Sequence, residues 1–229
     1  MKQGILYGIG VGPGDPELMT LKAVSAIRAC DIIAIPHKNR DQCVALNIAV
    51  GAVPELKNMP ILEIHMPMTK DPNALTAAYQ AGADALCAKL KEGLQVGFLT
   101  LGDPTVYSTY MYLHYLVRER GYDTRIIPGI PSFCAAAAAC GEALCLGDEQ
   151  LHIIPGNYGQ SEALSYPGTK VIMKNDSPEL RALLESSPIR VTTVEKCTMP
   201  DQKIYQGIDA LPKDKSYLRL MILRDPPKE

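Results

Sequence analysis

The feature that most constrains the fold is the alternation of strand-like and helix-like segments over residues 1–128. Short runs rich in aliphatic and β-branched residues predict strands at 5–11, 31–36, 61–66, 94–100 and 124–128. The segments between them carry apolar residues at three- and four-residue spacing, which predicts helices at 16–30, 43–53, 73–93 and 106–121. Strands that alternate with helices in this way build a mainly parallel sheet that has helices on both faces.

The sequence changes character after Arg125. Two prolines and a glycine fall within IIPGIPSF (126–133), and an alanine-rich stretch at 134–141 predicts a short helix. Shorter predicted strands follow at 151–155, 170–173, 190–195, 203–206 and 216–223. Because turns rather than long helices separate several of them, antiparallel pairing is favoured. We therefore predict an α/β fold of two α/β domains, 1–127 with a mainly parallel sheet and 128–229 with a mixed sheet.

The tripeptide Gly-Asp-Pro occurs twice, at 14–16 and at 102–104, and follows an apolar run each time. An Asp accepts the free N–H groups of a first helical turn, and Pro suits the first helical position. Each corner therefore predicts a strand-to-helix turn with exposed main chain at the carboxyl end of a strand, where ligands bind in parallel sheets. A capped helix start that holds no ligand is the alternative interpretation of either corner.

Several common catalytic motifs are missing from the sequence. Glycines at 8, 10, 12 and 14 never fall in the G-x-G-x-x-G register, and no G-x-x-x-x-G-K-[ST] occurs. Neither Ser108 nor Ser132 stands in a G-x-S-x-G turn. The histidines are scattered without metal-ligand spacing, at His37, His65, His114 and His152. A Rossmann dinucleotide site, a P-loop and a serine-hydrolase site are therefore disfavoured, and His114, among tyrosines on a predicted helix, is interpreted as a packing residue.

Composition excludes further classes of protein. The 23 Lys and Arg against 25 Asp and Glu give a net charge of −2 without a run of like charges, which disfavours a general nucleic-acid-binding face. No apolar run is long enough for a membrane span, and the first ten residues do not form a signal peptide, so we expect a cytoplasmic protein. Seven cysteines without a CxxC pair predict buried free thiols and no protein-bound metal.

Four segments, taken in order and spacing, resemble the tetrapyrrole methyltransferase family: VGPGDPELMTLKAVSAIRACDII, TLGDPTVYSTYMYL, IPGIPSFCAAAAACG and TTVEKCTMPDQKIY. The resemblance covers essentially the whole chain. The GDP-x-x-YST form, the PHKNR loop and VEKCTMPDQKIY are most similar to the branch that methylates C-20 of precorrin-2 or of cobalt-factor II. The resemblance implies S-adenosylmethionine as methyl donor, a tetrapyrrole substrate in cobalamin biosynthesis, a homodimer, and an active-site trough between the two domains.

The resemblance also implies which residues contact the methyl donor. They come from both GDP corners, the PGIPSF turn and the strand ends of the second domain: Pro13, Leu101, Gly102, Asp103, Val106, Ser132, Phe133, Met173, Lys174, Cys197, Tyr217 and Leu218. The chain departs from many relatives at Pro131, where they carry Thr or Ser. Because proline offers neither a hydroxyl nor an N–H group, any ligand bond there must come from Ser132 or another segment.

Two further groups of residues are candidates for the reaction itself. Tyr107, in the YST segment, is the candidate for orienting the reacting atoms, and packing between helix and sheet is its alternative role. The substrate carries acetate and propionate carboxylates, so a slightly acidic protein needs a local positive lining. His37, Lys38 and Arg40 follow the second predicted strand at its carboxyl end and are the candidates, with solvated loop charge as the alternative.

Other functions stay open at this point. A relative that methylates another ring carbon belongs to the same enzyme class. A tetrapyrrole-binding protein without turnover, or an RNA-modifying relative, belongs to different classes, since a fold does not by itself imply a function. No residue indicates whether the macrocycle is metal-free or holds cobalt.

Overall fold

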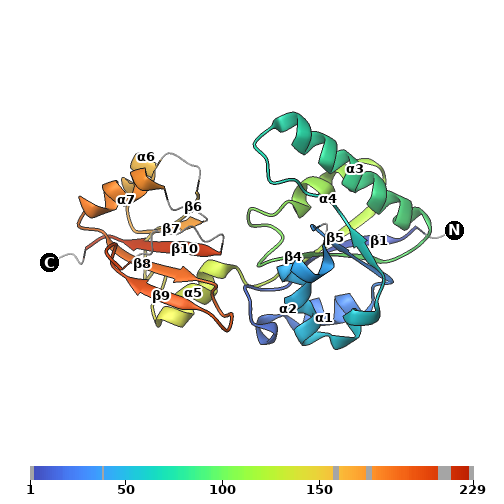
Figure 1. Cartoon of the computed structure of the whole chain (residues 1–229), viewed down its shortest axis with the longest axis horizontal. Helices are drawn as coiled ribbons and strands as arrows, with labels where there is room; N and C mark the ends of the chain where they lie inside the picture. The colour runs from blue at the N-terminus through green and yellow to red at the C-terminus, as the bar shows by residue number, and fades with distance from the viewer. Residues whose placement is uncertain (1–2, 38, 157–159, 174–176, 211–217, 227–229) are drawn as a thin grey trace. The chain divides into compact units, whose positions relative to one another are not determined.

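The computed structural model describes residues 3–37, 39–156, 160–173, 177–210 and 218–226 (Figure 1). The chain divides into two compact units, Met1–Pro131 and Ser132–Glu229. The division falls in the proline-rich loop, within a few residues of the predicted boundary after residue 127.

The first unit contains a five-stranded parallel sheet. Its strands are β1 (Ile5–Gly10), β2 (Ile32–Ile35), β3 (Ile61–Glu63), β4 (Val96–Thr100) and β5 (Asp123–Ile127). They pair in the order β3-β2-β4-β1-β5, and every pair is parallel. Every residue of β2 and β4 is buried, as expected for inner strands that helices cover on both faces. The predicted parallel sheet is confirmed.

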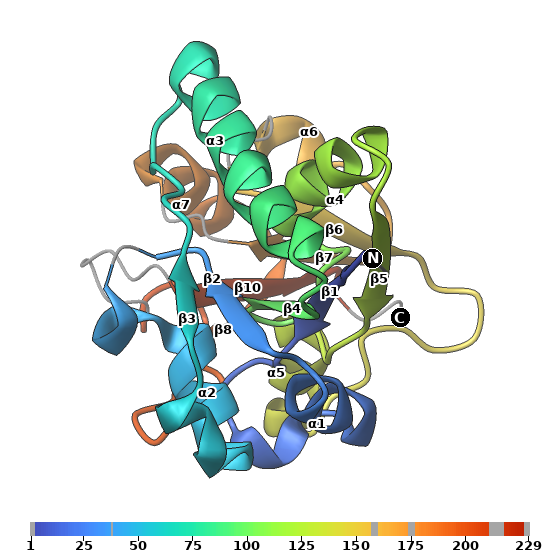
Figure 2. The same cartoon turned by 90° about the vertical axis from the view of Figure 1, so that its right-hand side faces the viewer.

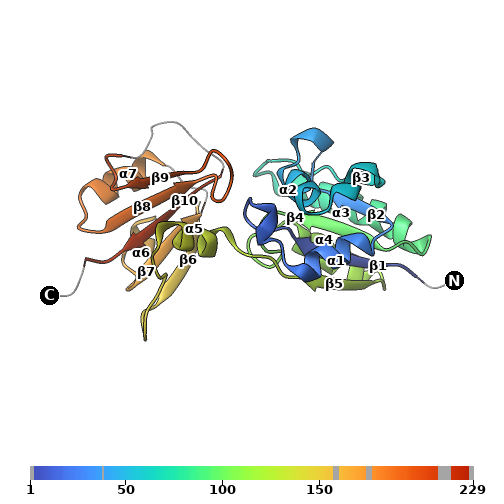
Figure 3. The same ribbon diagram turned by 90° about the horizontal axis from the view of Figure 1, so that it is seen from below.

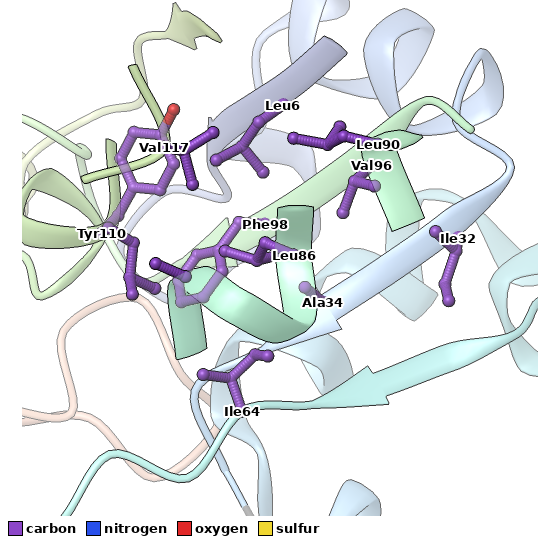
Figure 4. Close-up of a cluster of buried hydrophobic side chains, with 12 residues drawn as sticks. Leu6, Ile32, Ala34, Ile64, Leu86, Leu90, Val96, Phe98, Tyr110 and Val117 are labelled. Atoms are coloured by element: carbon purple, nitrogen blue, oxygen red, sulfur yellow. The ribbon is translucent and has the colours of Figure 1, made fainter. Parts of the chain in front are cut away.

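Helices cover both faces of this sheet, as predicted. The α-helices are α1 (Leu21–Arg28), α2 (Val44–Ala52), α3 (Pro72–Lys91) and α4 (Tyr110–Glu119), and short 3-10 helices are η1 (Pro16–Leu18), η2 (Arg40–Gln42) and η3 (Pro54–Asn58). Figure 2 shows α3 and α4 on one face and α1 and α2 on the other. On the α3/α4 side, Leu6 and Phe98 of the sheet pack with Leu86 and Tyr110 of the helices (Figure 4).

Tyr110 fixes α4 against the sheet. A Cβ added at Gly8 would lie 2.1 Å from the Tyr110 ring, so only glycine leaves room for it. The buried Tyr110 hydroxyl donates to the Arg125 carbonyl at 3.2 Å and lies 3.2 Å from His114 Nδ1. His114 is 6% exposed, and burial lowers its pKa, with Arg118 adding to the effect. The prediction that His114 is a packing residue is confirmed.

The second unit contains a mixed sheet, also as predicted (Figure 3). Its strands are β6 (Leu151–Pro155), β7 (Thr169–Met173), β8 (Arg190–Glu195), β9 (Lys203–Gln206) and β10 (Arg219–Arg224). They pair in the order β6-β7-β10-β8-β9, where β6 and β7 are parallel and the other pairs are antiparallel. Helix α5 (Ser132–Cys140) contacts β10 on one face, and α6 (Gln160–Leu164) and α7 (Pro178–Glu185) cover the other.

Helix α7 was not predicted from the sequence. Ser177 accepts a hydrogen bond from Leu180 N at 3.1 Å, and Pro178 occupies the first turn, which together are a regular helix-start signal. Leu180 and Leu184 then pack on the sheet. The Ser-Pro signal is present in the sequence, although no helix was predicted between the strands at 170–173 and 190–195.

All seven cysteines are free, but they are not all buried. Cys30, Cys43 and Cys197 are buried, whereas Cys134 and Cys145 are exposed. The prediction of buried free thiols therefore holds for these three and not for Cys134, which is exposed on α5, or Cys145, which is exposed in the loop beyond it. None of the described helices combines the length and apolar character that a bilayer crossing requires.

Candidate functional site

The two GDP corners meet through their main chains. Gly102 N donates to Gly12 O at 2.8 Å, and Gly12 N lies 3.3 Å from Gly102 O, so the two residues form a bridge beyond the ends of β1 and β4. Both residues have left-handed backbones, with φ of 75° at Gly12 and 71° at Gly102. This conformation favours glycine. The repeated motif is thus explained by a physical pairing of the two corners.

Two more glycines complete what we call the glycine junction, formed by Gly10, Gly12, Gly102 and Gly129. A Cβ added at Gly129 would lie 2.1 Å from Gly102 O, and one added at Gly10 would lie 2.6 Å from the same oxygen. No other residue fits at either position without movement of the backbone. The junction therefore brings the segments that follow β1, β4 and β5 into direct main-chain contact.

Open space lies beside the α-carbon of Gly102. Although Gly102 itself is buried, a Cβ added there would meet a single atom within 4 Å, the Ile130 carbonyl oxygen at 3.9 Å. We call this space the Gly102 recess. A recess bordered by main chain and a carbonyl oxygen can admit a ligand group and favours positive charge on it.

The structure brings the predicted first-unit residues of the donor site together. Gly102 pairs with Gly12, the residue before Pro13, and Leu101 precedes Gly102 in the chain. Val106 N donates to Asp103 O at 3.3 Å. Pro13 is buried, and Leu101 and Val106 are half-buried.

Asp103 pins the glycine junction. Its Oδ2 accepts a hydrogen bond from Gly129 N at 2.9 Å, and its Oδ1 accepts bonds from the Thr105 amide, at 2.7 Å, and the Thr105 hydroxyl. The residue is 8% exposed. Both oxygens thus serve the loop itself, and the turn closes on Thr105.

The second corner does not start a helix, contrary to the prediction. Helix α4 begins only at Tyr110, because residues 104–107 form a turn and a bend before it. At the first corner Asp15 does cap a helix, since its Oδ1 accepts from Glu17 N at 2.8 Å, but this is the three-residue η1. Helix α1 has its own cap, Thr20, so the predicted helix at 16–30 is divided in two.

Tyr107 lies at the end of the second corner. Its side chain is 51% exposed and its backbone is left-handed, with φ of 48°. The alternative that it packs between helix and sheet is wrong, because a residue in that position would be buried. The hydroxyls of the flanking Thr100 and Ser108 lie 2.8 Å apart.

The charged loop after β2 is partly engaged with the protein itself. Arg40 Nη2 donates to the carbonyls of Leu56 at 3.2 Å and Lys57 at 2.6 Å, which fixes the end of η3. His37 Nδ1 accepts from Asn39 N at 2.9 Å, which leaves Nε2 as the ring nitrogen able to donate. The predicted substrate residue Lys38 lies outside the described residues.

Three of the predicted second-unit residues share one end of the mixed sheet. Met173 ends β7 and pairs with Leu220. Leu218 O accepts a hydrogen bond at 2.8 Å from the amide of Lys196, the residue before Cys197. Ser132 and Phe133 begin α5, where Ser132 is half-buried and Phe133 is 6% exposed. The predicted Lys174 and Tyr217 lie outside the described residues.

Cys197 stands in a strained turn and has a protonated thiol. Its neighbours Lys196 and Thr198 are left-handed, with φ of 47° and 63°. Burial raises the pKa of the Cys197 thiol to about 11, and Cys140 adds to the effect. A thiol with this pKa is a poor nucleophile at neutral pH, so Cys197 can contribute to a site through its main chain or as a small apolar group. Within the described ranges, no three His, Cys, Asp or Glu side chains are grouped to hold a metal ion.

Sequence reasoning missed several residues that build these sites. Thr100 and Ser108 hold the second corner, and Gly129 belongs to the glycine junction. Glu195 and Arg219, which are 8% and 2% exposed, form a buried ion pair beside the Cys197 turn. The PGIP sequence was a visible signal for a constrained Gly129, whereas the other contacts join residues whose proximity only the fold defines.

Comparison with known proteins gives consistent results. The sequence profile of the Tetrapyrrole (Corrin/Porphyrin) Methylases matches residues 5–208. The "Probable cobalt-precorrin-2 C(20)-methyltransferase" of Methanocaldococcus jannaschii is 35% identical over 225 residues, covering 96% of this chain and 95% of the relative. The "Precorrin-2 C(20)-methyltransferase" of Sinorhizobium sp is 31% identical over 236 residues, with the same coverage of 96% and 95%.

Solved structures share the fold. Uroporphyrin-III-C-methyltransferase from Thermus thermophilus matches with a TM-score of 0.74 at 20% identity, covering 97% of this chain and 94% of that chain. The same enzyme complexed with S-adenyl homocysteine matches with a TM-score of 0.69 at 17% identity, covering 97% and 98%.

Proposed function

Because the chain belongs to the tetrapyrrole (corrin/porphyrin) methylases, a family of S-adenosylmethionine-dependent enzymes, we propose that it methylates C-20 of a precorrin-2-type tetrapyrrole in cobalamin biosynthesis. One observation carries the choice of carbon atom. The two relatives described above match almost end to end, and both are named for transfer to C-20. They differ in whether cobalt is present, so the metal state of the substrate is left to experiment.

The first-unit residues fit the proposed methyl donor. S-adenosylmethionine carries a sulfonium next to a small, flexible aminocarboxylate arm, and when bound it supplies an already activated methyl group. The Gly102 recess is open beside the α-carbon and bordered by the Ile130 carbonyl, which suits a positively charged group. We propose that Pro13, Leu101, Gly102 and Val106 hold this part of the donor. Contacts with the adenosine part of the donor stay predictions for Ser132, Phe133, Met173, Lys174, Cys197, Tyr217 and Leu218.

Because the donor's methyl group is already activated, the protein mainly has to align the donor with the ring carbon. Methyl transfer requires the methyl group, the sulfur and the ring carbon to lie in line, so most of the rate enhancement comes from positioning. A strong base is not required, because the proton that C-20 later loses can go to water. Tyr107 is the residue that we propose for orienting the reacting atoms, since its side chain is half-exposed beside the second corner.

Asp103→Ala is expected to raise the Kd for S-adenosylmethionine by about tenfold or more, because Gly129 loses its hydrogen-bond partner and the recess loses its shape. Isothermal titration calorimetry measures this Kd, and the Kd for the tetrapyrrole should change less. Asp15→Ala, which removes the matching cap at the first corner, is the control and should leave donor affinity nearly unchanged. Equal weakening of donor and tetrapyrrole by Asp103→Ala would contradict the assignment of the recess to the donor.

The charged loop gives a second prediction. Removing two positive charges by Lys38→Ala with Arg40→Ala is expected to raise the KM for the tetrapyrrole about tenfold, with little effect on donor affinity. Arg40→Lys separates charge from structure, because it keeps the positive charge but loses the guanidinium that anchors η3. Lys91→Ala removes an exposed lysine at the C-terminal end of α3, outside the charged loop, and is the matched control. An unchanged KM in the double variant would make this loop a solvated surface.

The proposed reaction is tested by an anaerobic single-turnover assay with methyl-labelled S-adenosylmethionine. Precorrin-2 and cobalt-factor II are offered separately, and the position of the label is determined by NMR. Label at C-20 is the expected result, and the preferred macrocycle assigns the metal state. Label at another carbon would change the proposed site of transfer, and binding of both compounds without transfer would support a binding protein.

A homodimer and a cytoplasmic location are further proposals. Size-exclusion chromatography with light scattering tests the first, and a mass of one chain would contradict it.

A further inference from the structure

Tyr107 has a backbone conformation that an aromatic residue seldom adopts. Among the described residues other than glycine, only Tyr107, Lys196 and Thr198 have positive φ. The left-handed conformation is unfavourable for a residue with a Cβ, and more so for a bulky one. Such strain persists only where the surroundings hold the residue in place, and it gathers at functional sites.

The segment that contains Tyr107 is anchored on both sides. On the N-terminal side Asp103 accepts hydrogen bonds from Thr105 N and Gly129 N. On the C-terminal side the hydroxyls of Thr100 and Ser108 lie 2.8 Å apart, and Ser108 Oγ also accepts from the amide of Tyr110 at 3.2 Å. Tyr107 is the last residue before the second anchor, so the turn must close at its backbone.

The second anchor rests on a rigid base. Thr100 is the last residue of β4, an inner strand of the parallel sheet, and it is 7% exposed. It stands on the same face of the strand as Phe98, which packs against Tyr110 of α4. The Thr100 hydroxyl therefore ties Ser108 to the sheet directly below the start of α4.

Packing of Tyr107 does not account for this strain. A side chain that is 51% exposed gains little from burial, and glycine or asparagine would adopt the same φ more readily. About half of this aromatic side chain is open to solvent, where it is accessible to a ligand.

We propose that the Thr100–Ser108 hydrogen bond is a latch that holds Tyr107 left-handed and so fixes its side chain for methyl transfer. This inference rests on the proposed function. Thr100 and Ser108 are positioning residues, because they contact each other and the backbone of the turn. Their contribution is to kcat, since they set the place of the orienting residue rather than the shape of the Gly102 recess.

The test compares variants that remove the latch with variants that keep it. Ser108→Ala and Thr100→Val are each expected to lower kcat about 10- to 100-fold, with the Kd for S-adenosylmethionine changed less than about twofold. Ser108→Thr keeps a hydroxyl and should retain most of the activity. Tyr115→Phe, which changes an exposed tyrosine of α4, is the control and should leave kcat unchanged.

Tyr107→Gly separates function from stability. It relieves the left-handed strain, so the melting temperature should stay the same or rise while kcat falls about as far as in Ser108→Ala. If Tyr107 served only the stability of the fold, Tyr107→Gly would lower the melting temperature and leave kcat normal. That result would overturn the latch. So would a normal kcat in both Ser108→Ala and Thr100→Val when the unmodified chain is active. No methyl transfer by the unmodified chain would overturn the proposed function, and the latch with it.

Discussion

The Gly129→Ala variant is expected to lose about 3 kcal/mol or more of unfolding free energy, because its Cβ would lie 2.1 Å from the Gly102 carbonyl oxygen. The contact cannot be relieved by a side-chain rotation, since both partners are main chain. The loop after β5 must move away, and the hydrogen bond from Gly129 N to Asp103 is lost with it. Donor affinity should fall together with stability, because the same movement deforms the Gly102 recess.

Gly121→Ala is the control for this prediction. Gly121 has φ of 83° and open space around an added Cβ, so alanine there is expected to cost only the left-handed penalty of roughly 1–2 kcal/mol. Urea unfolding followed by circular dichroism measures both variants, because the chain has no Trp for fluorescence. Equal losses in the two variants would show that the close approach within the glycine junction is not what excludes a side chain.

The inner strands β2 and β4 could be predicted from the sequence because they are buried on both faces. The predicted strands 31–36 and 94–100 are mainly apolar, and the observed β2 and β4 lie within them, with ends that agree to within two residues. The order of the strands in the sheet could not be predicted. It depends on which helix faces pack together, and no local pattern encodes that.

The second corner shows why part of the site could not be predicted from the sequence. Asp-Pro after a strand is a sound local signal for a helix start, and at Asp15 it was correct for a short helix. At Asp103 the carboxylate is engaged by Thr105 and by Gly129, which is 26 residues further along the chain. A contact made across the sheet therefore overrides the local preference and delays the helix until Tyr110. The same long-range contact holds Gly129 in the glycine junction.

The second unit was predicted less completely for a different reason. Its strands were found, but a strand of four to six residues defines a register only through its partners. Met173 and Leu218, the residues proposed to share one site, lie at one end of the sheet. The ion pair of Glu195 and Arg219 beside them was missed, because two charged residues in predicted strands ordinarily face solvent.

Glu195→Ala is expected to lower the unfolding free energy by about 3–5 kcal/mol, because it takes the Glu195 carboxylate away from the buried Arg219 guanidinium. Glu195 accepts from Arg219 Nε through Oε1 and from the Tyr205 hydroxyl through Oε2, so the substitution removes the centre of a buried network. The adjoining turn should loosen too, since Lys196 N donates to Leu218 O one residue further on. Urea unfolding measures the first effect, and the Kd for S-adenosylmethionine measures the second.

Two further variants show whether burial of the ion pair causes the predicted loss of stability. Asp201→Ala removes the exposed ion pair of Lys196 on the other side of the same turn and should change the urea midpoint little. Glu195→Met combined with Arg219→Met removes both buried charges and should recover much of the stability, because apolar groups of similar size need no partner. If the double variant recovers stability but not donor affinity, the ion pair is kept for the conformation of the Lys196–Thr198 turn. A double variant as unstable as Glu195→Ala would contradict the account, because the loss could not then come from an uncompensated charge.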